Sequence, residues 1–202
     1  MKNLFKIAIL ATFSICVLFV ANALQGEPVA KIGETAPNFT LKDIDGKTVE
    51  LSALKGKYVI LEWWNCDCPF VKKFYAVGAM QKLQKELTED GVVWLTICSS
   101  GEGKEGFQTT ESAKAKRKEA GMNSSNIILD PKGTLGKTWG AKTTPHMFII
   151  EPKGTIIYNG AIDSIRSAKS ADIEKAENYV VKAYKEAKAG QPVTVSKTQP
   201  YG

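Results

Sequence analysis

The chain has 202 residues, of which 44% are hydrophobic and 24% are charged, and its formal net charge is +6. This composition suits one globular domain with a sizeable core and excludes a disordered or low-complexity chain. Lysines are mixed with acidic residues, and the densest basic run, Lys116–Lys118, is followed directly by Glu119. The positive charge therefore indicates a solvated surface rather than a nucleic-acid partner.

The first 23 residues differ from the rest of the chain. Lys2 and Lys6 precede an apolar run that ends in Ala21-Asn22-Ala23. This pattern is typical of a secretory signal peptide, and we expect cleavage at the end of that run. A retained membrane anchor is the alternative, but the run is short for a membrane span. A lipoprotein is disfavoured because the large Ile15 precedes Cys16. We expect an exported protein with no stable membrane association after cleavage.

The next part of the chain alternates strands and helices. Residues 39–51 predict a hairpin, because alternating apolar residues flank the favoured Asp45-Gly46 turn. Residues 57–64 and 92–98 are near-continuous apolar runs, as expected of strands buried on both faces. Between these strands, residues 69–87 carry the apolar side of a helix that opens at a proline.

The C-terminal half continues the alternation. We predict a polar helix at 111–120, a strand at 126–130, a helical turn at 135–141, a hairpin of 147–151 and 155–159, and a last helix at 171–189. Gly190 and Pro192 end that helix. We expect one domain over 24–190, followed by an extended tail at 191–202.

This order of elements predicts an α/β fold with a central mixed sheet flanked by helices. Strands 57–64 and 92–98 are joined by a helical crossover, so they should run parallel with their carboxyl ends at one edge. Cys66 and Cys68 follow the first strand, and Cys98 ends the second. We therefore expect the three cysteines to meet at the edge where such sheets gather their chemistry. After export, this odd number of thiols favours redox or metal chemistry over a structural disulfide framework.

Cys68 is the candidate nucleophile. It stands directly before Pro69, and proline suits the first position of a helix. The amides at a helix N-terminus favour an anion, and Lys72 and Lys73 should add positive charge. The sequence therefore predicts an exposed thiol with a lowered pKa at Cys68.

The stretch VILEWWNCDCPFVKK resembles the active-site segment of the thioredoxin superfamily. The resemblance implies that Cys68 takes the place of the attacking cysteine and Glu62 that of a buried acid beneath it. KTTPHMFII (142–150) is similar to the second signature of that superfamily. It implies a cis peptide bond between Thr144 and Pro145, facing the attacking sulfur.

The resemblance extends over residues 30–190 and becomes more specific there. IGETAPNFTLKDIDGKTVELSALKGKYVILEWW and LDPKGTLGKTWGAKTTPHMFIIEPKGTIIYNGAID are similar to the redoxin branch, the alkyl hydroperoxide reductase/thiol-specific antioxidant (AhpC/TSA) family. N-x-x-C-P-F-V-K-K and T-T-P-H-M-F resemble one secreted bacterial subgroup of this family. This implies a thioredoxin fold with an N-terminal β-hairpin extension, thiol-dependent antioxidant or oxidoreductase activity, and a periplasmic location.

The chain departs from the dithiol pattern of that superfamily. Val71 stands where the second cysteine of C-x-x-C would be, so another thiol must resolve a mixed disulfide at Cys68. Cys66 and Cys98 are both candidates, and the sequence leaves the choice open. A thiol beyond Gly202 is not invoked.

A peroxiredoxin-like activity also lacks part of its pattern. That family uses a Thr or Ser where this chain has Asn65, and its later arginine is replaced at Pro145, with Arg166 too far along to substitute. Asn65 can donate a hydrogen bond, but the set of donors around a peroxide is incomplete. We therefore expect thiol–disulfide exchange, with at most a weak peroxidase activity.

Further side chains belong to the predicted site. Glu62 lies in a strand that should be buried and is either a proton shuttle to the sulfur or a solvated edge residue. His146 is the only histidine and is either close to the thiolate, a metal ligand, or a packed structural residue. We assign Cys68, Cys66, Cys98, Glu62 and Pro145 to catalysis, and Asn65, Trp64, Thr144 and His146 to substrate binding.

The predicted substrate is a protein or small-molecule disulfide, or a peroxide, with an external thiol donor and no cofactor or metal. The oligomeric state is left open. The alternative is a copper(I)-binding protein, because thiolates and imidazole suit that metal; its ligands would be Cys66, Cys68, Cys98 and His146. A third class is a binding module that kept the fold and lost catalysis.

Overall fold

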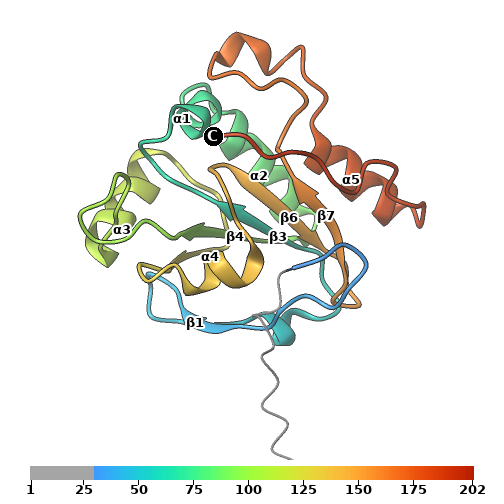
Figure 1. Cartoon of the computed structure of the whole chain (residues 1–202), viewed down its shortest axis with the longest axis horizontal. Helices are drawn as coiled ribbons and strands as arrows, with labels where there is room; N and C mark the ends of the chain where they lie inside the picture. Colours follow the sequence, from blue (N-terminus) through green and yellow to red (C-terminus); the bar gives the residue numbers. More distant parts are fainter. Residues whose placement is uncertain (1–29) are drawn as a thin grey trace, which may run out of the picture.

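The computed structural model describes residues 30–202, so the predicted signal peptide lies outside the described residues. The central strands are β3 (Val59–Trp63), β4 (Val93–Cys98), β5 (Asn126–Leu129), β6 (His146–Ile150) and β7 (Ile156–Gly160). They form one sheet in the order β5-β4-β3-β6-β7 (Figure 1). β3 and β4 are parallel, as are β4 and β5, whereas β6 is antiparallel to both β3 and β7. The predicted mixed sheet and its parallel pair are confirmed.

The N-terminal hairpin forms a separate two-stranded sheet. β1 (Thr40–Lys42) pairs antiparallel with β2 (Thr48–Glu50), and a short 3-10 helix, η1 (Leu51–Leu54), follows. Gly46 in the turn has φ 80°, a conformation that glycine adopts without steric cost. The side chain of Asp43 accepts hydrogen bonds from the amides of Asp45 and Lys47 and so closes the turn. The predicted hairpin is confirmed.

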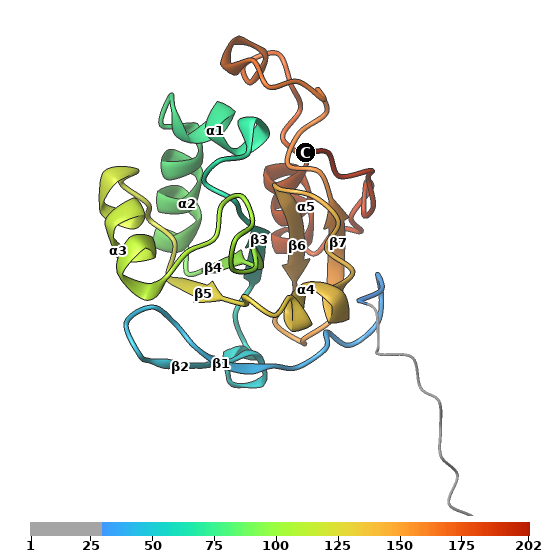
Figure 2. The same ribbon diagram turned by 60° about the vertical axis from the view of Figure 1, so that its left-hand side comes forward.

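Helices and the hairpin cover the two faces of the central sheet. The helices are α1 (Pro69–Tyr75), α2 (Ala79–Glu89), α3 (Thr110–Glu119), α4 (Thr134–Trp139) and α5 (Tyr179–Lys188). Leu61 and Trp63 of β3 pack toward α4 and the hairpin, whereas Ile60 packs toward α2 and α5. Figures 1 and 2 show the hairpin and α4 on one side of the sheet and α2 and α5 on the other. β3 is therefore buried on both faces, which explains its continuous apolar sequence.

The helix predicted over 69–87 is two helices. α1 ends at Tyr75, and α2 begins at Ala79 after Gly78, whose φ is 74°. That left-handed conformation ends the first helix and redirects the chain into the second. The apolar side chains at both ends of the pattern still face the core, so periodicity alone did not reveal the break.

The last helix begins later than predicted. Its expected start falls in the 3-10 helix η2 (Ser170–Asp172), and α5 begins at Tyr179 with Asn178 as its N-cap. The amide of Tyr179 donates to Ile162, and the carbonyl of Glu177 accepts from Ser164. These pairings use backbone groups that a longer helix would need. Across residues 30–202, every helix is too short or too polar to pass through a bilayer.

We expect Gly78→Ala to lower the free energy of unfolding by about 1–2 kcal/mol, the cost of a left-handed residue with a side chain. A Cβ at this position would meet open space, so the loss would come from the backbone alone. Urea unfolding at neutral pH measures the change. Gly78→Asn is the matched control, because asparagine tolerates this conformation better; an equal loss in both variants would contradict the explanation.

Candidate active site

The turn that follows β3 is built around Asn65. Its carbonyl accepts a hydrogen bond from the Cys68 amide at 3.2 Å, and its side-chain oxygen accepts one from the Asp67 amide at 2.8 Å. The Asn65 side-chain amide donates to the carbonyl of Glu105 at 3.3 Å, in the loop after β4. These contacts close the turn, so that Cys68 becomes the N-cap of α1 and Pro69 its first residue.

The Cys68 sulfur lies against the segment that precedes β6. Its Sγ donates to the Thr144 carbonyl oxygen at 3.0 Å, and the Thr144–Pro145 peptide bond is cis, as predicted. The residue is only 7% exposed and packs in a cluster with Trp64 and Val71. The expectation of an exposed thiol is therefore wrong, because apolar side chains of the turn and of α1 cover most of it.

The two lysines of α1 face carboxylates. Lys72 Nζ lies 3.6 Å from Asp67 at the surface, and Lys73 Nζ lies 3.0 Å from Asp163 in the interior. Each ammonium of α1 therefore has a carboxylate partner of its own. The Cys68 sulfur is also turned toward Thr144 rather than toward the first amides of α1.

A cavity of about 490 Å³ opens beside Cys68. Of the predicted site residues, Trp64, Asn65, Cys68 and Thr144 line it. The rest of the wall comes from the end of β3, the start of α1, the loop after β4, α4, the segment before β6 and the C-terminal segment: Trp63, Pro69, Phe70, Ser99, Ser100, Glu105, Gly136, Ala141, Lys142, Thr143 and Gly202. The carboxyl ends of β3 and β4 thus contribute to one cavity, as expected from their parallel pairing.

Cys66 and Cys98 share a second set of partners. The Gln108 side chain donates to Cys66 Sγ at 3.2 Å and to the Gly106 carbonyl at 3.4 Å, and Cys98 Sγ donates to that same carbonyl at 3.4 Å. Cys66, Cys68 and Cys98, the cysteines of the described residues, are all free and lie in or against one apolar cluster near the carboxyl ends of β3 and β4. Burial raises the pKa of both Cys66 and Cys98, and the Asp67 carboxylate raises that of Cys66 further.

Glu62 is fully buried in the central strand, so the alternative of a solvated edge position is wrong. Its carboxylate accepts hydrogen bonds from four side chains at 2.8–3.1 Å: Tyr75, Gln84, Trp94 and Thr96. Burial raises the pKa of Glu62, and these donors partly oppose that effect. The carboxylate lies on the sheet face under α1 and α2, outside the residues that line the Cys68 cavity.

His146 is packed inside the sheet rather than directed at the sulfur. Nδ1 accepts from the Lys142 amide at 3.2 Å, and Nε2 lies 2.7 Å from the Asn159 side-chain oxygen. The ring also stacks on Phe148, with centroids 4.6 Å apart. Burial lowers the pKa of His146 to about 4, so the imidazole is neutral at pH 7.

The copper alternative needs His146 beside the three cysteines. Both imidazole nitrogens already have hydrogen-bond partners in the protein. Within residues 30–202, no group of three or more His, Cys, Asp and Glu side chains is arranged to hold a metal ion. The predicted ligands are therefore not brought together.

Several residues of the site were missed by the sequence analysis. Gln108 and Gly106 join two of the cysteines, and Gly202 closes one side of the cavity. Ser99 accepts from the Trp63 indole at 3.1 Å and donates to Asp130 at 2.7 Å. The polar, glycine-rich loop after the second strand could have indicated the first group, whereas the tail carried no comparable signal.

The site combines a cysteine at a strand-to-helix turn with a cis-proline segment on a neighbouring strand. Solved structures of the same architecture include an uncharacterised conserved protein of Geobacillus kaustophilus, with 23% identity, TM-score 0.71, and 87% of this chain and 89% of that chain covered. The thioredoxin domain of a Bacteroides vulgatus thiol-disulfide oxidoreductase has 21% identity and TM-score 0.51 over 72% of this chain and 96% of that one. These likenesses establish the thioredoxin fold.

Curated relatives carry the name thiol-disulfide oxidoreductase ResA. The Halalkalibacterium halodurans protein is 36% identical over 46% of this chain, and the matched stretch spans only about half, 52%, of that relative. The Bacillus cereus protein is 29% identical over 77% of this chain and 86% of its own length. These curated relatives are thus thiol-disulfide oxidoreductases by name, and they share the thioredoxin-fold architecture with solved structures. The AhpC/TSA family matches residues 32–159, and the chain belongs to that family.

Glu62→Gln should remove a pH-dependent loss of stability. Burial raises the pKa of Glu62 above 4.5, so the folded state holds this proton more tightly than the unfolded state. Wild-type stability should therefore fall as the pH rises from about 4.5 through the raised pKa, and the variant should lack this fall. Urea unfolding between about pH 4 and pH 8 tests it.

The control for that experiment is Glu62→Ala. The alanine leaves the buried donors of Trp94, Thr96 and Gln84 unpaired, and we expect a loss of about 3 kcal/mol or more at neutral pH. In Glu62→Gln, by contrast, the side-chain amide can still accept hydrogen bonds from these groups and donate one to Tyr75. An unchanged pH profile in Glu62→Gln would contradict the assignment.

Titration of His146 should change stability with pH in the opposite direction to titration of Glu62. Its folded pKa of about 4 lies below its ordinary value of 6.5, so stability present above pH 6.5 is lost as the pH falls toward 4. The full effect is about 3 kcal/mol. We expect His146→Gln to show a flatter profile in this window, measured by the same unfolding experiment. A variant with the wild-type slope would show that His146 is not its source.

Proposed function

We propose that the chain is an exported thiol–disulfide oxidoreductase in which Cys68 attacks the substrate. The observation that carries this proposal is the position of the Cys68 sulfur, 3.0 Å from the Thr144 carbonyl and beside a cavity of about 490 Å³. Two further thiols in the same cluster support a chemistry that ends in a disulfide within the chain. The ResA relatives carry the matching activity in their names.

The proposed reaction has two exchange steps. Cys68, as the thiolate, attacks one sulfur of a disulfide RS–SR′; a Cys68–SR bond forms, the S–S bond breaks, and R′S⁻ leaves and takes a proton from solvent. A second thiolate of the chain then attacks the Cys68 sulfur, and RS⁻ leaves. An external thiol donor returns two electrons to the resulting disulfide.

We assign the resolving role to Cys66. It lies in the same tight turn as Cys68, two residues away, and it is half-buried, whereas Cys98 is only 2% exposed. Its contact with Gln108 also links it to the loop after β4, which borders the cavity. Cys98 is then a neighbouring thiol that takes no part in the exchange.

The peroxide reaction receives less support than disulfide exchange. Asn65 stands where a peroxiredoxin has a threonine or serine. Its side-chain amide, the candidate donor to a peroxide, donates instead to the Glu105 carbonyl. Its oxygen is occupied by the Asp67 amide. A peroxide at Cys68 would thus lack the donor set that stabilises cleavage of an O–O bond.

Export is proposed from the sequence. Lys2 and Lys6, the apolar run and the Ala21-Asn22-Ala23 site are those of a signal peptide. The three remaining cysteines would then work in an oxidising compartment, where thiol–disulfide exchange has a substrate supply.

Cysteine substitutions test the proposed order of events. We expect Cys68→Ser to lower the rate of disulfide reduction by about 100-fold or more, because the nucleophile is lost. Cys66→Ser should accumulate a mixed disulfide at Cys68, detected by intact mass after acid quenching. Cys98→Ser is the matched control and should turn over at nearly the wild-type rate.

Two results would contradict this assignment. If Cys68→Ser retains the wild-type rate, the nucleophile is another thiol. If Cys98→Ser, rather than Cys66→Ser, accumulates the mixed disulfide, Cys98 is the resolving residue.

A further inference from the structure

The C-terminal segment pairs with the edge of the sheet and leads to the site. The Asn159 amide donates to Ser196 at 3.0 Å, and the Thr198 amide donates to Asn159 at 3.2 Å, so the segment runs parallel to β7. The Thr198 hydroxyl accepts from the Ala161 amide at 2.8 Å. Gly160 packs so tightly that a Cβ there would lie 2.1 Å from Thr198 Oγ1. The segment is thus an ordered part of the fold.

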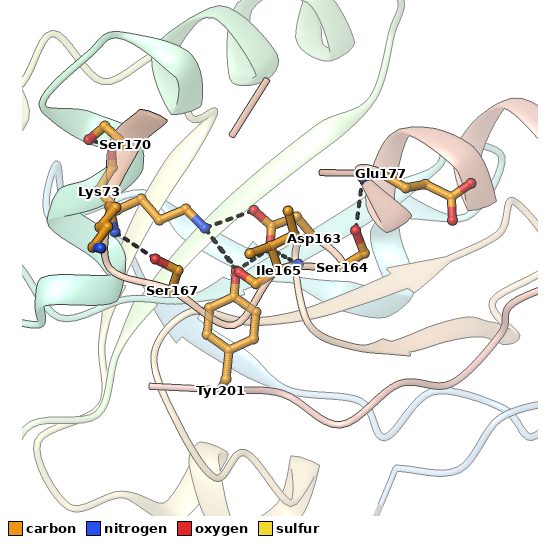
Figure 3. A network of polar contacts seen from close by, with 9 residues as sticks. Lys73, Asp163, Ser164, Ile165, Ser167, Ser170, Glu177 and Tyr201 are labelled. Atoms are coloured by element: carbon orange, nitrogen blue, oxygen red, sulfur yellow. Dashed lines mark hydrogen bonds and ion pairs between the residues drawn. The ribbon is translucent and has the colours of Figure 1, made fainter. Parts of the chain in front are cut away.

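Tyr201 anchors the end of this segment beneath α1. Figure 3 shows its hydroxyl between Lys73 and Asp163. The hydroxyl donates to Asp163 Oδ1 and accepts from Lys73 Nζ at 3.3 Å, and the same ammonium donates to Asp163 Oδ2 at 3.0 Å and to the Ile165 carbonyl at 3.3 Å. The ring also meets Phe70 edge to face at 5.6 Å. A side chain that satisfies a buried ion pair is costly to remove.

That anchor places Gly202 directly on Thr144. A Cβ at Gly202 would lie 2.2 Å from the Thr144 oxygen and 2.8 Å from its nitrogen. The same oxygen accepts the hydrogen bond from Cys68. The backbone that flanks the nucleophile is therefore covered by the chain's own segment.

Because the C-terminal segment lies on the Thr144 backbone, it limits which disulfides can reach Cys68. An extended polypeptide binds beside a strand by pairing with free backbone N–H and C=O groups. At Thr144 these groups lie under Gly202 and the Cys68 thiol. The remaining cavity has a volume in the range of small-ligand sites, and Lys142 and Glu105 are the charged residues of its wall.

We propose that Tyr201 and Gly202 are specificity-determining residues that restrict Cys68 to low-molecular-mass disulfides and exclude extended polypeptides. Opposite charges on the wall suit a small disulfide that carries both ammonium and carboxylate groups, such as oxidised glutathione. The inference rests on the proposed function for its reaction, but the steric exclusion is a property of the fold and is testable without turnover.

Alkylation measures the exclusion directly. In a Cys66→Ser, Cys98→Ser background, Cys68 is the one cysteine of residues 24–202 left to react. We expect Gly202→Val to accelerate labelling by a maleimide-tagged peptide about tenfold or more, because the side chain displaces the segment from Thr144. Labelling by iodoacetamide should change by less than about twofold, since the small reagent already enters. Gln199→Ala, an exposed change in the same segment, is the matched control.

A second variant, Tyr201→Phe, tests whether the result with Gly202→Val comes from an effect on folding. Tyr201→Phe keeps the ring and removes the hydroxyl contacts with Lys73 and Asp163. It should loosen the anchor, so we expect faster labelling by the peptide and iodoacetamide labelling within about twofold of wild type, as in Gly202→Val. If the ratio of the two labelling rates is unchanged in both variants, the inference is overturned.

Turnover provides the complementary measurement with the three native cysteines in place. Wild type should reduce oxidised glutathione with a higher kcat/KM than insulin, and Gly202→Val should narrow that ratio. A wild type that reduces insulin as efficiently as glutathione overturns the inference. A wild type that reduces neither contradicts the proposed function, while the labelling ratio still decides the steric exclusion.

Discussion

The hydrogen bond between the Cys68 thiol and the Thr144 carbonyl is the contact on which the site depends. It joins residues that are 76 positions apart, and it requires β3 and β6 to be antiparallel neighbours with Trp63 opposite His146. In that register, the turn after β3 lies beside the segment before β6. Because both strands are buried throughout, a slip by one residue would move every core side chain to the wrong face. The core therefore fixes the geometry of the sulfur.

Two buried polar anchors attach α1 to the rest of the fold. Tyr75 at its end donates to Glu62, and Lys73 in its middle pairs with Asp163. The two anchors differ physically, since uncharged donors surround one carboxylate and an ammonium compensates the other. Phe74 adds an apolar contact between them. A seven-residue helix has little stability of its own, so these contacts orient it and thereby the cysteine at its first turn.

Local patterns predicted most of the fold. The strands, the hairpin turn at Gly46 and the meeting of the three cysteines followed from periodicity and from the rule for parallel strands. The cis bond at Pro145 followed from the resemblance alone. The predictions that failed concern contacts between residues that are distant in sequence. The pairing of Lys73 with Asp163, the late start of α5 and the burial of Cys68 are set by contacts that no local window contains. The C-terminal segment was expected to be extended, but no local pattern indicated that Gly202 lines the cavity.

The ion pair under α1 also constrains how the nascent chain is completed. The partners of the Lys73 ammonium lie 90, 92 and 128 residues further along the chain. During synthesis, which delivers the chain from its N-terminus, this ammonium cannot pair with Asp163 until that residue emerges. α1 and the cysteine at its start consequently settle late. Until Asp163 is in place, Cys68 and Cys98 lack part of the packing that leaves them only 7% and 2% exposed in the folded chain, so unwanted pairing of these thiols is favoured during folding.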